Sequence, residues 1–163
     1  MSRIMDDAIR PALATLDLQY LWGSANNDQD VVIVPMPISE STTDQLLIVI
    51  RADEELKEVV IEVSLLEIPP GRYSAAALVL AQLNNRYKGV TFAFGRNGDV
   101  RVHAFVELTF ASDPAPLVAL SIARLGTALS RSFAEIAGVT SGKVKRGMQP
   151  YASPPRLAHP AMT

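Results

Sequence analysis

Residues 75–108 read AAALVLAQLNNRYKGVTFAFGRNGDVRVHAFVEL, and this stretch decides the fold class that the sequence predicts. Its first half places apolar residues at helical spacing and is followed by Gly89, which favours a short helix with a defined end. Its second half alternates apolar and polar residues on both sides of Asn97 and Gly98, which is typical of a β-hairpin. A helix that leads directly into an antiparallel hairpin indicates an α+β domain.

The residues of the hairpin also predict its register. A two-residue turn at Asn97 and Gly98 would pair Phe92 with His103 and leave the phenylalanines on the polar face. A three-residue loop with Gly98 in the left-handed conformation instead pairs Phe92 with Val102, which gathers the apolar side chains on one face. We therefore predict the second register. The opposite face is then lined by Thr91, Ala93, Arg101, His103, Phe105 and Glu107.

Two further features describe the helices in the first half of the chain. An amphipathic helix is expected at about 5–16, with Asp6 and Asp7 as its cap candidates. Ser74 is the expected cap of the helix that precedes the hairpin. Both predictions place a side-chain oxygen where the first backbone N–H groups of a helix need an acceptor.

The remaining segments complete the architecture. A last helix opens at Asp113 and Pro114 and stops at Gly138. The order helix, strands, helix, hairpin and helix predicts an α+β fold in which helices flank a twisted antiparallel sheet. Strands before the hairpin are expected at 31–36, 46–50 and 59–66, with a shorter one at 18–22.

The composition limits the kind of protein. The chain has 163 residues, enough for one domain with a substantial core, and it has no cysteine, which excludes disulfides and thiolate chemistry. No apolar run approaches the roughly 18 residues of a membrane span, and the first residues lack the apolar centre of a secretory signal. We expect a cytoplasmic protein without membrane contact. Its hydrophobic content of 48% predicts an association surface, and we expect a homodimer because twofold dimers are commonest.

The charges divide the chain into two parts. All 17 acidic residues lie at or before Glu135, whereas the charged residues of 139–163 are all basic and the segment contains several prolines. We predict an α+β domain at 1–138 and a basic, proline-containing flexible tail at 139–163. A solubilising tail is the simpler interpretation of this segment. The alternative is an arm that contacts nucleic acid or an acidic partner through Lys143, Lys145 and Arg146.

Several segments together carry a family resemblance. They are the early helix, the strand at 31–37 leading into 46–51, the strand exit at 67–69, Leu83-Asn84-Asn85-Arg86 and the hairpin at 94–101. On these pieces, residues about 4–138 resemble the YbjN family, whose members share the fold of type III secretion chaperones. The resemblance implies a dimer that binds an extended segment of a client protein, with tails of stress-response or DNA-repair proteins among the clients. It implies a sensory or regulatory role and no enzymatic activity.

Candidates for chemistry are few. His103 and Glu107 share a strand face and could form a metal or general-base pair, but the chain has one other histidine, His159 in the tail. The carboxylates at 53–58 lack the ligand pattern of a calcium loop and are interpreted as a solvated turn. We predict that the protein is not an enzyme and has no catalytic residue, metal site or cofactor.

Two functional hypotheses follow. The first is a dimeric protein-binding module that uses Arg101, His103 and Phe105 as an accessible sheet face, by strand addition or apolar contact. In the competing structural interpretation, Phe105 belongs to the core or to a dimer interface. The second hypothesis is a nucleic-acid-associated protein using the basic tail, which the acidic domain disfavours because it would repel a phosphate backbone. We therefore do not expect direct nucleic-acid binding.

Overall fold

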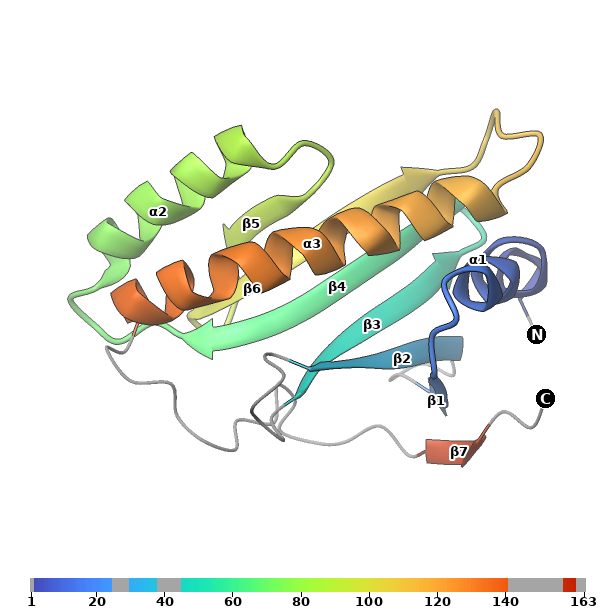
Figure 1. The fold of residues 1–163 in the computed structure, drawn as a ribbon, viewed down its shortest axis with the longest axis horizontal. Coiled ribbons are helices and arrows are strands. Elements are labelled where there is room, and N and C mark those ends of the chain that lie inside the picture. Colours follow the sequence, from blue (N-terminus) through green and yellow to red (C-terminus); the bar gives the residue numbers. More distant parts are fainter. Residues whose placement is uncertain (1, 25–29, 38–44, 141–156, 161–163) are drawn as a thin grey trace.

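The computed structural model describes residues 2–24, 30–37, 45–140 and 157–160. It contains one antiparallel sheet whose strands lie in the order β5-β6-β4-β3-β2-β1-β7, with helices packed on one face (Figure 1). This arrangement confirms the predicted α+β architecture. The helical segments are the π-helical turn η1 (Met5–Ile9), α1 (Arg10–Thr15), α2 (Tyr73–Arg86) and α3 (Ala115–Thr140). The strands are β1 (Leu21–Ser24), β2 (Asp30–Pro37), β3 (Gln45–Asp53), β4 (Glu58–Glu67), β5 (Thr91–Phe94), β6 (Asp99–Glu107) and β7 (Leu157–Pro160).

The core lies between the sheet and the helices. The long helix α3 runs across β4 and β6 (Figure 1), and its predicted apolar stripe is buried, with Leu125 and Leu129 fully enclosed. On β4, Val59, Ile61 and Val63 alternate toward the same layer and are also fully buried. Burial of one such side chain is worth about 1.5–3 kcal/mol. The contact between α3 and the two central strands is therefore a major source of stability.

The first helix begins differently from the prediction. Asp6 and Asp7 lie inside η1 and do not cap it. The acceptor comes instead from the β3–β4 turn, where Glu54 Oε1 accepts hydrogen bonds from the Ser2 hydroxyl at 2.5 Å and the Ile4 backbone N–H at 2.9 Å. These bonds, led by the one from Ser2, lower the pKa of the Glu54 carboxyl. The turn at 53–58 was predicted to be solvated, but its Glu54 carboxylate is hydrogen-bonded to the N-terminal segment.

Two other predicted helix ends are also wrong. The helix α2 begins at Tyr73, one residue before Ser74, and no side chain in the described residues caps it. The helix α3 continues through Gly138 to Thr140. The Thr140 side chain is buried and its hydroxyl donates to the Ile136 carbonyl at 2.9 Å. Since a helical glycine costs only about 1 kcal/mol, this burial outweighs the stop signal.

The predicted tail, 139–163, is described only in part. Residues 139 and 140 belong to α3, and Leu157–Pro160 forms β7, which pairs antiparallel with β1. Segments 141–156 and 161–163 lie outside the described residues. The extent of a flexible tail therefore stays a prediction.

The hairpin has the predicted register. Phe92 pairs with Val102 and Phe94 with Val100, while Gly98 adopts a φ of +75°, the left-handed conformation that the three-residue loop requires. The outer side of β5 is bound by Asn84 of α2. Its side-chain amide donates to the Phe92 carbonyl at 2.9 Å, and its carbonyl accepts from the Phe92 N–H at 2.7 Å. Asn84 thus takes the place that a neighbouring strand would fill.

This pair of hydrogen bonds leads to a stability prediction. Replacing Asn84 by alanine removes the hydrogen-bond partners of the Phe92 N–H and carbonyl, which are partly buried. The free energy of unfolding should fall by about 1–2 kcal/mol. The control is Asn85→Ala, because Asn85 is the next residue of α2 and is exposed. Urea unfolding of the two variants measures the difference. Equal stabilities would show that the Asn84 bonds contribute no net stability.

Candidate functional site

The alternation of β6 assigns its side chains to two faces. Val102, Ala104 and Val106 are buried toward the helices, whereas Arg101, His103 and Phe105 point to the opposite side of the sheet. All the described helices pack on the first side (Figure 1). The term open face is used below for the helix-free side of β3, β4 and β6. The register prediction for these residues is confirmed.

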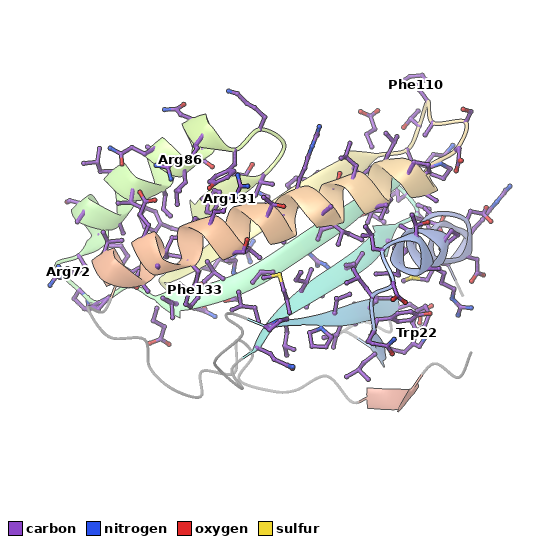
Figure 2. All side chains as sticks on the ribbon, in the orientation of Figure 1. Trp22, Arg72, Arg86, Phe110, Arg131 and Phe133 are labelled. Carbon is purple, nitrogen blue, oxygen red and sulfur yellow. The ribbon has the colours of Figure 1, made fainter. Side chains whose placement is uncertain are left out.

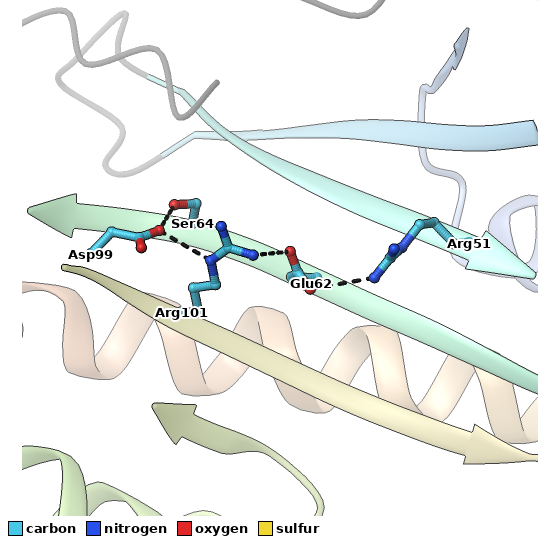
Figure 3. Close-up of polar contacts among 5 residues, drawn as sticks. All are labelled: Arg51, Glu62, Ser64, Asp99 and Arg101. Carbon is cyan, nitrogen blue, oxygen red and sulfur yellow. Dashed lines mark hydrogen bonds and ion pairs between the residues drawn. The ribbon is translucent and has the colours of Figure 1, made fainter. Parts of the chain in front are cut away.

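A chain of polar contacts crosses the open face (Figure 3). Glu62 of β4 lies between two arginines, with Oε2 at 3.4 Å from Arg51 Nη2 and Oε1 at 3.1 Å from Arg101 Nη1. Arg101 Nε is 3.2 Å from Asp99 Oδ2, which also accepts a short hydrogen bond from the Ser64 hydroxyl. This charge ladder, made of Arg51, Glu62, Ser64, Asp99 and Arg101, connects three strands.

The charge ladder changes the role expected of Arg101. The two arginines and Glu62 are partly exposed, and such ion pairs contribute little stability, about 0–1 kcal/mol each. Asp99 and Ser64 are buried at one end of the ladder. The ladder places the guanidinium of Arg101 between two carboxylates, Glu62 and Asp99. The positive charge of Arg101 is therefore largely neutralised within the chain. Arg101 serves better to order the face than to attract a partner.

His103 and Phe105 form the accessible part of the open face. Phe105 is 57% exposed, so it is not part of the core of this chain. Its ring meets the His103 ring edge-on, with centroids 5.0 Å apart. Burial lowers the pKa of His103, and the negative charge of Glu62 opposes this shift. His103 is consequently neutral at pH 7 and presents an uncharged ring beside Phe105.

Apolar side chains from neighbouring strands extend this surface. Val60 of β4 is paired with Phe105, and Val49 of β3 is paired with Glu62; both valines are half-buried. On the neighbouring strand β2, the side chains on this side of the sheet are inaccessible to solvent, since Val31 and Ile33 are only 2% and 3% exposed. The candidate site is therefore the β6 side of the open face, an exposed phenylalanine bordered by half-buried valines and a charge ladder.

The other predicted residues do not add to this site. His103 and Glu107 share the face, but no group of three or more metal-ligating side chains occurs in the described part of the chain. Lys143, Lys145 and Arg146 lie outside the described residues. Among the described helices, none is long and apolar enough to cross a bilayer.

Sequence reasoning missed Glu62 and Asp99. Both looked like ordinary polar positions, at a solvated strand face and after the hairpin turn. The signal that could have found them is cross-strand register: β4 pairs with β6 so that Ser64 lies opposite Arg101 and Glu62 opposite His103. That pairing joins strands that are not consecutive in the chain, and so the hairpin alone does not predict it.

Comparisons with known proteins agree with this architecture. No protein-family model and no curated protein matches the chain. Among solved structures, it is similar to YbjN of E. coli, a proposed transcription regulator, with a TM-score of 0.54 and 14% identity over 78% of this chain and 89% of that one. The chain has a YbjN-like fold.

A second solved structure has the same architecture. It is a chain of the heterodimeric ExoU–SpcU complex from the type III secretion system of Pseudomonas aeruginosa, with a TM-score of 0.51 and 17% identity. The match covers 81% of this chain and 97% of that one. The YbjN-like chain therefore also has the type III secretion chaperone-like fold that the sequence resemblance implied.

The lowered pKa of His103 predicts a pH dependence of stability. Because the folded state disfavours the protonated ring, acid should stabilise the unfolded chain once the pH falls below the usual histidine pKa of about 6.5. The free energy of unfolding should decrease from that pH down to the lower pKa of the folded state and then level off. Glu54 titrates at lower pH and does not contribute to this window.

Urea unfolding between about pH 7.5 and pH 5 measures this effect around the histidine pKa. His103→Gln should flatten the decrease, whereas His159→Gln, which changes the second histidine of the chain, should leave it unchanged. An unaltered slope in His103→Gln would assign the pH dependence to another group.

Proposed function

We propose that this protein is a non-enzymatic protein-binding module of the chaperone or adaptor type. It acts as a cytoplasmic homodimer and holds an extended segment of a client protein against the open face. The observation that carries the proposal is Phe105, a large aromatic side chain 57% exposed in the middle of a strand, beside a neutral histidine. Aromatic residues at such positions are typical anchors of protein interfaces.

The edges of the sheet favour contact with the face over strand addition. At the β5 edge, the N–H and C=O groups of Phe92 are hydrogen-bonded to Asn84, so they are not available to pair with an incoming strand. At the other edge, β1 is paired with β7 of the same chain, so that the edge strand is the four-residue β7. Strand addition would have to displace Asn84 or use this short strand, whereas the open face on β6 is accessible without rearrangement.

The fold similarity supports the proposal at the level of architecture. A chain with this architecture occurs in a heterodimeric secretion-system complex, and another is a proposed transcription regulator. Neither description assigns an enzymatic role to the fold. Stress-response and DNA-repair proteins remain the first clients to test, as the resemblance of the sequence implied.

The client interaction can be tested by retention of proteins from lysate on the tagged full-length chain, with nuclease present. Phe105→Ala should reduce the retained client about tenfold, equivalent to the loss of about 1.4 kcal/mol of binding energy. The matched control is Phe110→Ala, because Phe110 is 93% exposed in the loop between β6 and α3 (Figure 2). Equal retention by both variants would argue against the open face as the binding site.

Two further arms separate the competing functions. A chain in which Lys143, Lys145 and Arg146 are replaced by glutamine, which leaves α3 and β7 in place, should keep its client if the open face binds it. Retained proteins that disappear with nuclease, or with these three substitutions, would instead support the basic tail and nucleic acid as the functional contact. That result would overturn the proposal.

The dimer is a separate prediction. Light scattering after gel filtration should give twice the chain mass of 17.6 kDa at micromolar concentration. A concentration-independent monomer would contradict the dimer and leave the open-face proposal to be tested by the Phe105 variant alone.

A further inference from the structure

A second surface feature lies on the opposite side of the molecule, in the helical layer. The C-terminal end of α2, the turn after it and the outer side of α3 enclose a groove of about 670 Å³. This volume is within the range of about 300–1,000 Å³ found for binding pockets. The helix groove, as it is called below, shares no residue with the open face.

Four of the nine residues that line the helix groove are cationic. Arg86 and Lys88 line one side, and Arg124 and Arg131 of α3 line the other. Figure 2 shows Arg86 and Arg131 near each other between the two helices. Arg86 is 3.0 Å from Glu135, and this contact raises its pKa. Within the described residues, the other three cations have no ion-pair partner. The groove therefore carries positive charge that the described residues do not neutralise.

The distribution of charge strengthens this feature. From α2 through Lys88 and along α3, the helical layer has four cations and a single carboxylate, Glu135. All other acidic residues of the chain lie outside these two segments. An uncompensated group of one sign in a hollow concentrates the electrostatic potential and attracts ligands of opposite charge. A patch of this kind on an otherwise acidic domain indicates a selective anionic ligand.

The spacing of the cations indicates the size of that ligand. Arg124 and Arg131 are seven residues apart on α3, which corresponds to about 10 Å along the helix axis. An extended peptide rises about 3.3 Å per residue and alternate side chains share one side, so carboxylates two or four residues apart, about 7 or 13 Å, bracket this distance. Arginine also has the planar donor geometry that binds carboxylates.

The floor of the groove indicates that the ligand also has apolar groups. Tyr87, Val90 and Leu120 contribute to the lining, and Leu120 is 46% exposed. An acidic segment with interspersed apolar side chains would cover this surface and pair with the cations. A nucleic acid would gain the same ion pairs, but its long phosphate backbone would be repelled by the acidic remainder of the domain.

We propose that the helix groove binds an acidic protein segment that also carries apolar residues. The proposal goes beyond the open-face function, since it requires neither Phe105 nor a dimer. The groove and the open face lie on opposite sides of the sheet, and so both can be occupied at once.

Fluorescence anisotropy of the full-length protein with a fluorescein-labelled peptide of alternating glutamate and leucine tests the proposal. The peptide should bind, and added sodium chloride should weaken the binding. The double variant Arg124→Gln and Arg131→Gln should weaken it about tenfold or more, since two charge-assisted contacts are lost. A peptide of alternating lysine and leucine should not bind to the groove.

The matched control is the double variant Arg72→Gln and Arg96→Gln, which changes the net charge equally. Both residues are exposed, and Arg72 lies at the other end of α2 from Arg86 (Figure 2). This control and Phe105→Ala should bind the glutamate–leucine peptide as the unmodified chain does. Thermal unfolding confirms that the groove variant is folded. Loss of binding in Phe105→Ala alone would assign the peptide to the open face.

Three further outcomes would overturn the proposal. The first is absence of peptide binding, or an equal loss in both double variants. The second is tighter, Arg124-dependent binding of a single-stranded oligonucleotide, which would make the groove a nucleic-acid site. The third is a change of oligomeric state in the groove variant, which would make the groove a contact between copies of the chain. None of these outcomes affects the Phe105-dependent capture of a client.

Discussion

The pairing of β4 with β6 is the constraint on which the rest of the structure depends. These strands are neighbours in the sheet although α2 and β5 separate them in the chain. Their shared helix-side face forms the surface that α3 covers, and their shared opposite face is the open face. Because side chains alternate with a period of two, one register decides both surfaces at once. A slip by one residue would expose the core and bury the charge ladder.

Electrostatics differ sharply between the two sides of the sheet. On the open face, two arginines share Glu62, and Arg101 also meets Asp99, so the charges compensate one another inside the chain. In the helix groove, Lys88, Arg124 and Arg131 have no such partners within the described residues. Cations that are already paired add little to recognition, whereas unpaired cations in a hollow attract anions. Arginine therefore orders the surface on the open face, whereas in the helix groove it is available for the anionic segment proposed above.

Side chains and short segments of the chain itself protect the sheet edges. Asn84 satisfies the outward backbone groups of Phe92 at one edge, and β7 pairs with β1 at the other. The unpaired backbone groups of an exposed edge strand can pair with other chains. Where these groups are already bonded, a partner is expected to contact surfaces formed by side chains instead. This is the physical reason that the β6 side of the open face is the better candidate for client contact.

Local patterns in the sequence determined which segments between residues 30 and 140 are helices and strands, the hairpin register and the face of β6 on which Arg101, His103 and Phe105 lie. Helical and strand periodicity and turn chemistry act over a few residues and can be read directly. Tertiary structure alone decided that Glu54 holds the first helix from 50 residues away, and that Glu62 meets an arginine 39 residues along the chain. It also decided that Gly138 does not end α3, because burial of Thr140 outweighs the propensity of glycine. Such contacts depend on which strands and helices become neighbours, and that choice is made by burying one common core rather than by any local pattern.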